Sequence, residues 1–335
     1  MDLFRNRILA LVVAAVLTAC GGGSSGGGSS GGGSIASAPG AANTGNAQFT
    51  SNNIVSLAGV VVTNSTRTKS LNMGMGAIQK SRGIGASYAA AVISSEVKNA
   101  AAVLLQTSGP QVATGAMQPF PQQTLNCRVS GTQTISGTFD TATMDANLTI
   151  TFNNCSHDGI NTMNGTMTAQ ATQYNTAYGN WASFSISFSN LTMQDQATTV
   201  GLNGTISEGQ DFALGTDTLT LNLAVSDSAT NSTVTMSNCS ETLTLGSNWR
   251  NATSYTFEVN GTICDSTNGC LTVTTTTPLN VPSLTAPYPD SGVLRLDGQP
   301  PSSVTLTASP TGVTITGTDS AGAQIGPMTV AWNQL

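Results

Sequence analysis

A period-two alternation of apolar and polar residues runs from about residue 130 to the end of the chain, and it limits the fold more than any other feature. Successive side chains of a strand point to opposite faces of a sheet, so this alternation predicts antiparallel strands with one apolar and one polar face. Thr and Ser fill most of the polar positions, and β-branched Thr suits a pleated backbone without adding charge. The alternating segments are 148–152, 184–188, 219–223, 255–259, 294–296, 304–306 and 313–315.

Turn dipeptides punctuate these segments. Asp158-Gly159, Asn203-Gly204, Asn260-Gly261 and Asp297-Gly298 are of the kind that closes tight hairpins. Their spacing predicts roughly twelve strands. We therefore expect a mainly β fold, a large antiparallel meander or sandwich, with one N-terminal helix packed on it.

Short motifs recur within this region. Phe-Asn-Asn-Cys-Ser at 152–156 and Met-Ser-Asn-Cys-Ser at 236–240 end similar Thr-rich segments, and Asn-Gly-Thr begins at 164, 203 and 260. No fixed period relates them, so we expect two related sheet units at best rather than a solenoid or a propeller.

Charge divides the mature chain into two parts. Between about residues 41 and 129 there are six basic residues and one acid, whereas residues 130–335 hold two basic residues and fourteen acids. We therefore separate a basic segment, 47–129, from an acidic β domain, 130–335. The whole chain has only 10 Lys plus Arg and a formal net charge of −6, which argues against a nucleic-acid partner.

Four basic residues lie close together in the basic segment. One interpretation is that they contact an anionic surface such as lipid or lipopolysaccharide phosphate. The other, which is favoured, is that they pack on the acidic sheet of the same chain. These residues are Arg67, Lys69, Lys80 and Arg82.

Residues 86–106 have the spacing of a helix. They are rich in Ala, and Glu96 and Lys98 lie in their middle. These charges favour a helix that packs on the surface of the sheet over one that spans a membrane. The residues that recur at helical intervals are Ala89, Ile93, Val97, Ala100 and Leu104.

The first twenty residues have the pattern of an export signal. Arg5 and Arg7 precede an apolar run that is too short to span a bilayer, and residues 17–20 read Leu-Thr-Ala-Cys. This pattern resembles the lipobox of bacterial lipoproteins. The resemblance implies that residues 1–19 are a signal peptide and that Cys20 carries the acyl chains of a membrane anchor. Gly21 stands where aspartate would signal inner-membrane retention, so the resemblance implies the outer membrane, on its periplasmic face or at the cell surface.

Residues 20–46 are then the lipidated cysteine followed by a tether. Gly and Ser dominate this stretch, which has little to bury, and Gly loses the most entropy on ordering. A flexible chain of this length has a reach of roughly 25–30 Å, enough to hold a folded domain clear of the lipid headgroups.

Five cysteines follow Cys20, and export to an oxidising compartment favours disulfides between them. We predict a bond from Cys127 to Cys155 across a long hairpin and one from Cys264 to Cys270 across a short turn. Cys239 is then free or an alternative partner, and other pairings stay open.

Few residues point to catalysis or to a bound cofactor. His157 is the only histidine and is expected at a solvated hairpin tip. Residues 265–269, Asp-Ser-Thr-Asn-Gly, are similar to the opening of a calcium loop, but the distal glutamate is absent. No haem, phosphate-loop or dinucleotide motif occurs. We expect no enzymatic activity, no cofactor and no metal.

Both ends of the chain are similar to those of a loose group of Gram-negative bacterial lipoproteins. The lipobox and the Gly/Ser tether carry the resemblance at one end, and residues 288–298, 303–308, 312–317 and 330–335 carry it at the other. No activity comes with this group, so it implies location and architecture only.

We therefore expect a lipid-anchored cell-envelope protein, a non-enzymatic binding or structural β domain at the outer membrane. Its expected partners are the membrane, through the anchor, and a glycan, an envelope protein or a lipid. The alternative is a periplasmic carrier that encloses a lipid or another apolar ligand.

Overall fold

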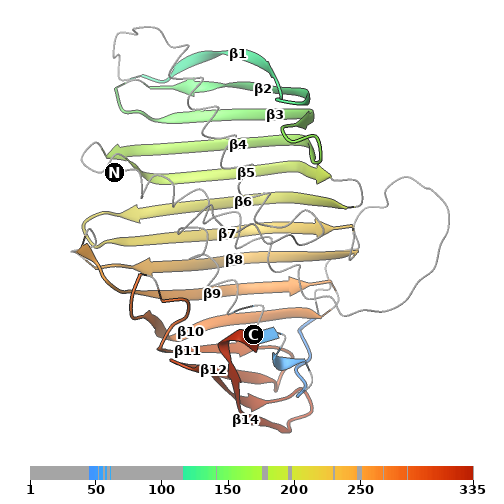
Figure 1. Cartoon of the computed structure of the whole chain (residues 1–335), viewed down its shortest axis with the longest axis vertical. Helices are drawn as coiled ribbons and strands as arrows, with labels where there is room; N and C mark the ends of the chain where they lie inside the picture. The colour runs from blue at the N-terminus through green and yellow to red at the C-terminus, as the bar shows by residue number, and fades with distance from the viewer. Residues whose placement is uncertain are drawn as a thin grey trace, which may run out of the picture.

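The computed structural model describes residues 45–51, 53–55, 57–58, 61, 116–140, 142–175, 180–194, 198–228, 231–246, 251–266, 268–284 and 286–334. These residues form fourteen antiparallel strands in one sheet, and each strand pairs with the next along the chain (Figure 1). The prediction of a mainly β antiparallel fold is confirmed, as a meander. The helix expected at 86–106 lies outside the described residues. Among the described residues, no helix is long and apolar enough to cross a membrane.

The strands are long, and most span 9 to 15 residues. Their bounds are β1 (Gln118–Asn126), β2 (Ser130–Phe139), β3 (Ala146–Ser156), β4 (Thr162–Asn175), β5 (Asn180–Gln194), β6 (Thr199–Asp211), β7 (Thr216–Asp227), β8 (Ser232–Thr244), β9 (Tyr255–Asp265), β10 (Gly269–Val281), β11 (Ser291–Asp297), β12 (Ser303–Ser309), β13 (Gly312–Thr318) and β14 (Gln324–Ala331).

The sheet has fourteen strands, so the expected count of roughly twelve is too low. The first edge strand, β1, lies before the expected β domain, and its prolines hide it in the sequence. β1 contains Pro119 and Pro121, and β14 contains Pro327. Proline lacks the N–H that a central strand must donate, but an edge strand tolerates it on its unpaired side. The same prolines discourage a further chain from pairing with these edges.

One face of the sheet is apolar and buried, as the alternation predicts. Two clusters of side chains make this inner face. The first runs over β2 to β8, and Ile135, Ile150, Met167, Ile186 and Ile206 are at most 1% exposed within it. The second lies under β9 to β14 and includes Phe49 and Ile54, which come from residues 45–61.

Residues 45–61 are tied to the C-terminal half of the sheet, and this segment is blue beside the last strands in Figure 1. The N–H of Ala47 donates to the carbonyl of Cys270 at 2.6 Å, and the N–H of Gln299 donates to the carbonyl of Ala47 at 2.8 Å. Thr50 and Asn53 then begin a helical turn with reciprocal bonds from each backbone N–H to the other's side-chain oxygen, at 2.8 and 3.3 Å.

A line of irregularities crosses the sheet at the recurring Asn motifs. Asn154, Asn190 and Asn238 have φ near +50° and stand as extra residues in β3, β5 and β8. Each of their N–H groups donates to an Asn side chain of the neighbouring strand at 2.7–2.8 Å. The acceptors are Asn164, Asn203 and Asn222. In β10, the N–H of Thr275 donates to Asn260 in the same way, at 2.9 Å.

This line of Asn side chains, from β3 to β10, explains the weak duplication in the sequence. An extra residue would turn every later side chain to the wrong face unless the apolar pattern also slipped by one. The apolar pattern of β5 shows this slip at Asn190. Phe188 and Leu191 are three residues apart instead of two, and both are buried. Asn-Gly-Thr is therefore the mark of a bulge repeated across one sheet, not of two separate units. The prediction that Asn203-Gly204 and Asn260-Gly261 close hairpins is wrong, because these dipeptides lie inside β6 and β9.

Candidate functional site

The outer face of β1 to β8 carries rows of short polar side chains that run across the strands. We call these rows the hydroxyl face. One row is Thr124, Thr134, Thr151, Thr166 and Ser189; the next is Ser136, Thr149, Thr168, Ser187, Thr205 and Asn222; the third is Thr138, Asn147, Gln170, Ser185, Ser207, Thr220 and Ser240. All of these residues are exposed or partly exposed.

Sheet geometry gives this face a regular spacing of about 4.8 Å between strands and about 6.8 Å between alternate residues of a strand. Neighbouring hydroxyls are in contact: Thr124 with Thr134 and Thr151 with Thr166, each at 3.3 Å between the Oγ1 atoms. None of the side chains in the three rows is ionisable or aromatic. The hydroxyl face can therefore donate and accept many neutral hydrogen bonds without repelling either sign of charge.

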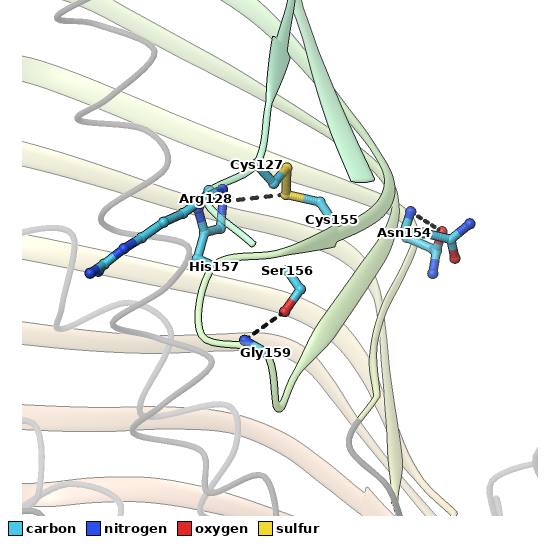
Figure 2. The surroundings of a disulfide bond; sticks show 8 residues. Cys127, Arg128, Asn154, Cys155, Ser156, His157 and Gly159 are labelled. Atoms are coloured by element: carbon cyan, nitrogen blue, oxygen red, sulfur yellow. Dashed lines mark hydrogen bonds between the residues drawn. A yellow bond between two sulfur atoms is a disulfide. The ribbon is translucent and has the colours of Figure 1, made fainter. Parts of the chain in front are cut away.

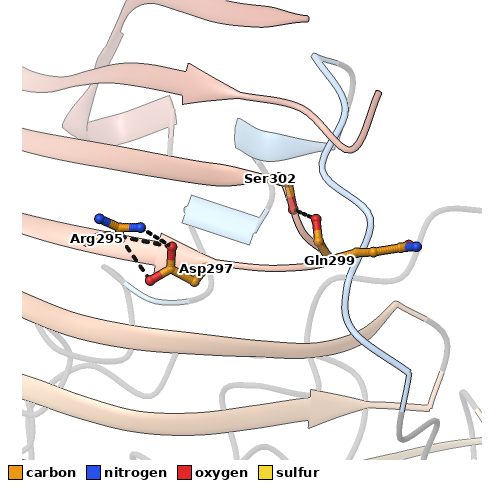
Figure 3. A network of polar contacts seen from close by, with 4 residues as sticks. All are labelled: Arg295, Asp297, Gln299 and Ser302. Atoms are coloured by element: carbon orange, nitrogen blue, oxygen red, sulfur yellow. Dashed lines mark hydrogen bonds and ion pairs between the residues drawn. The ribbon is translucent and has the colours of Figure 1, made fainter. Parts of the chain in front are cut away.

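Charged side chains on the outer face include Glu258 in β9 and an ion pair in β11. The Arg295 guanidinium pairs with the Asp297 carboxylate at 2.8 Å on the same strand (Figure 3). Arg295 is 53% exposed, so this pair adds little stability. Beside it, Ser302 Oγ donates to the carbonyl of Gln299 and closes the turn into β12.

The two predicted disulfides are present, and Cys239 is the free cysteine among the described residues. Cys127–Cys155 joins the end of β1 to β3 with 5.5 Å between the Cα atoms, and Cys264–Cys270 closes the hairpin between β9 and β10. Asp265 caps that second hairpin by accepting from the N–H of Asn268 at 2.8 Å. The residues that look like a calcium loop thus form a capped turn.

His157 is partly exposed and lies against the first disulfide, as Figure 2 shows. Its Nε2 is 3.3 Å from Cys155 Sγ, and the N–H of Arg128 approaches its Nδ1 at 3.4 Å. The expected position in a turn is right, and the ring is partly exposed there while one of its nitrogens contacts the disulfide. The disulfide accounts for this contact, because it draws the end of β1 over the β3–β4 turn.

Cys239 lines an apolar cavity of about 40 Å³ on the inner face, with Val61, Leu221, Met236, Val259 and Val273 among the walls. Its Sγ donates to the carbonyl of Thr262 at 3.2 Å. Burial raises the pKa of this thiol to about 11, so it stays protonated and is a poor nucleophile near neutral pH.

Other predicted site residues lie outside the described residues. These are the lipidation candidate Cys20 and the basic residues Arg67, Lys69, Lys80 and Arg82. No hydroxyl-face residue was a sequence candidate, because the alternation shows which side chains share a face but not which ones align across strands. Comparison with family models, with curated proteins and with solved structures finds no match to this chain.

Proposed function

We propose that the chain is a lipid-anchored protein of the cell envelope whose β domain is a non-enzymatic binding or structural module at the outer membrane. The lipobox pattern before Cys20 and the Gly/Ser tether support the anchor. The two disulfides support export, since such bonds persist in oxidising compartments.

The hydroxyl face is the observation that carries the binding part of the proposal. A single neutral hydrogen bond contributes little net free energy because water competes for both partners. Rows of hydroxyls at a regular spacing can make many such bonds at once. This arrangement suits a neutral, extended partner that is itself rich in hydroxyls, and a glycan of the envelope has that chemistry.

A pelleting assay with insoluble neutral polysaccharides and the detergent-solubilised mature protein tests this binding. Thr168→Asp with Thr205→Asp places two charges in the middle row of the hydroxyl face, whereas Thr311→Asp places one in the exposed β12–β13 turn. We expect the wild type and Thr311→Asp to pellet with the polysaccharide and the double variant to stay in solution. Equal behaviour of all three proteins would contradict a role for the face.

The anchor has its own test. Cys20→Ala should move the protein from the membrane fraction to the soluble fraction, because it removes the acylated residue. Cys239→Ala is the matched control and should leave the protein in the membrane fraction. Membrane retention of Cys20→Ala would refute lipid anchoring.

The carrier alternative relates to the apolar cavity at Cys239. About 40 Å³ is room for roughly three water molecules and is too small for an acyl chain. A lipid would therefore require the cavity to open. Extraction of the non-acylated protein into organic solvent, followed by mass spectrometry, decides between the two: a stoichiometric lipid would favour the carrier, and an empty protein would favour the binding module.

A further inference from the structure

Two carboxyl groups lie on the apolar inner face, where the alternation calls for hydrophobic side chains. Glu208 in β6 stands two residues after Ile206, and Asp217 in β7 stands two residues before Leu219. Glu208 pairs with Leu219 and Gln210 with Asp217, so the two acids are diagonal neighbours across the hairpin. Glu208 is only 3% exposed.

The hydrogen bonding of this pair is incomplete. Glu208 Oε1 accepts from Gln210 Nε2 at 2.9 Å, and the side chains of Glu208, Asp217 and Gln210 are in mutual hydrogen-bonding contact. Ionised carboxylates only accept, so neither acid can donate to the other in its charged form. In that form Glu208 Oε2 and Asp217 Oδ1 are sealed from solvent without a donor. Buried oxygens without partners cost free energy, and a bound cation would satisfy both of them.

The described neighbours supply no cation. Phe184 of β5 and Leu219 of β7 flank Glu208, and the next side chain in that row is another acid, Glu241 of β8. Asp211 follows Gln210 at the end of β6 and adds a further negative group. Burial, with a smaller contribution from Glu241, raises the pKa of the Tyr255 phenol in β9. The cations among the described residues, Arg128 and Arg295, belong to the β1–β2 turn and to β11.

Burial acts on both carboxyls. It raises the pKa of Glu208 well above its usual range, and the nearby Asp217 adds to the effect. Burial also raises the pKa of Asp217, to about 6. Without a positive partner the pair therefore holds a proton close to neutral pH.

A cavity of about 20 Å³ lies at the end of the β6–β7 hairpin, and Gln210 and Asp217 are in its wall. A third acid, Asp211, also lines it, and one oxygen of Asp211 accepts from the backbone N–H groups of the following turn. The volume of the cavity is close to that of a single water-sized sphere. The space thus borders Asp217, which is one of the two acids with an unpartnered oxygen.

We propose that Glu208, Asp217 and Gln210 form a calcium site at this end of the β6–β7 hairpin. Two carboxylates offer up to four oxygens, and the Gln210 amide can turn its own oxygen inward, since amide orientation follows the hydrogen-bond network. Calcium accepts six to eight oxygens in irregular geometry, whereas magnesium demands a near-ideal octahedron and keeps its waters. The small, partly apolar space suits calcium.

Binding is an exchange of one ion for another. The carboxyl pair takes up Ca²⁺ and releases the one proton that it shares to solvent, so charge and atoms balance. With only two carboxylates we expect a Kd on the order of 10⁻⁴ to 10⁻³ M, the range of extracellular calcium modules. The site is independent of the hydroxyl face and of the anchor.

Thermal unfolding of the mature protein with CaCl₂ and with EDTA tests the site. At a hundredfold excess over Kd, calcium should raise the Tm by about 5–10 °C. Glu208→Gln and Asp217→Asn should each abolish this shift, and both should fold because they replace buried acids by neutral side chains of the same shape. Asp265→Asn removes the acid of the other calcium-like turn and should keep the full shift.

A second measurement separates calcium binding from a shared proton. Addition of CaCl₂ in weak buffer should release about one proton per protein from the wild type and none from Glu208→Gln. If the wild type shows no calcium shift, or if Glu208→Gln and Asp217→Asn keep it, the site is refuted. A raised Tm of Glu208→Gln without any calcium response in the wild type would also overturn the proposal in favour of a shared proton.

Discussion

Gly204→Ala tests the line of Asn side chains that crosses the sheet. Gly204 follows Asn203 in β6 and has φ of +114°, a conformation that a residue with a Cβ adopts only under strain. A Cβ there would also overlap the backbone carbonyl oxygen of Asn222 in β7. The overlap involves backbone rather than a flexible side-chain end, so the two strands must move apart locally.

Two costs add up in this variant. Backbone strain of this kind costs about 1–3 kcal/mol. A buried ladder group that loses its partner costs about 1–3 kcal/mol more. We expect Gly204→Ala to lower the free energy of unfolding by about 3 kcal/mol, within the summed range of these two costs. For a domain of this size, this change lowers the Tm by roughly 6–12 °C.

Gly209→Ala in the same strand is the matched control. Nothing lies within 4 Å of a Cβ at Gly209, so alanine should be neutral or stabilise β6 by about 0.5–1 kcal/mol. Both variants are compared by circular dichroism at one scan rate and by urea midpoint. If Gly204→Ala and Gly209→Ala unfold at the same temperature, the bulge geometry assigned to Asn203-Gly204 is wrong.

Three further results are expected. Serine at Cys127 and Cys155 should cost about 3.5 kcal/mol and serine at Cys264 and Cys270 about 2 kcal/mol by loop entropy, so the first pair should lower the urea midpoint more. Cys239, with its pKa near 11, should react with a thiol reagent at about pH 8 only after unfolding; fast reaction of the native protein would contradict its burial. In calcium-free buffer, stability should fall as pH rises from about 4 through 6, because folded Asp217 keeps a proton that the unfolded chain releases; Asp217→Asn should flatten this slope in a pH series of unfolding midpoints.

Local pattern was sufficient to predict the class of the fold. Alternation in segments such as 219–223 depends only on which face of the sheet each side chain occupies. The apolar residues of this segment are buried, and the polar residues between them are exposed or partly exposed. The disulfides were predictable because each closes a single hairpin. By contrast, β1 was missed because Pro119 and Pro121 argue locally against a strand, and only its place at the sheet edge makes them acceptable.

Alignment between strands could not be predicted from the same pattern. The contact of Glu208 with Asp217 depends on the register across the turn after Asp211, and the contact of His157 with Cys155 depends on a disulfide that closes over the turn. One signal was available in the sequence. Glu208 and Asp217 each occupy an inward position of the alternation. An acid is rarely buried there unless it is paired, so two inward acids indicate a special site.

The position of residues 45–49 relative to the hydroxyl face bears on the proposed lipid anchor. Residues 45–49 bond to Cys270, Gln299 and Ser320, so the chain leaves the sheet near β10 to β14. The hydroxyl face is centred about six strands away, near β4, which at about 4.8 Å per strand is roughly 29 Å. If the sheet points away from the membrane, this distance adds to the roughly 25–30 Å reach of the proposed tether. A lipid-anchored domain of this design would present its uncharged face well outside the headgroup layer, within reach of an extended partner such as a polysaccharide.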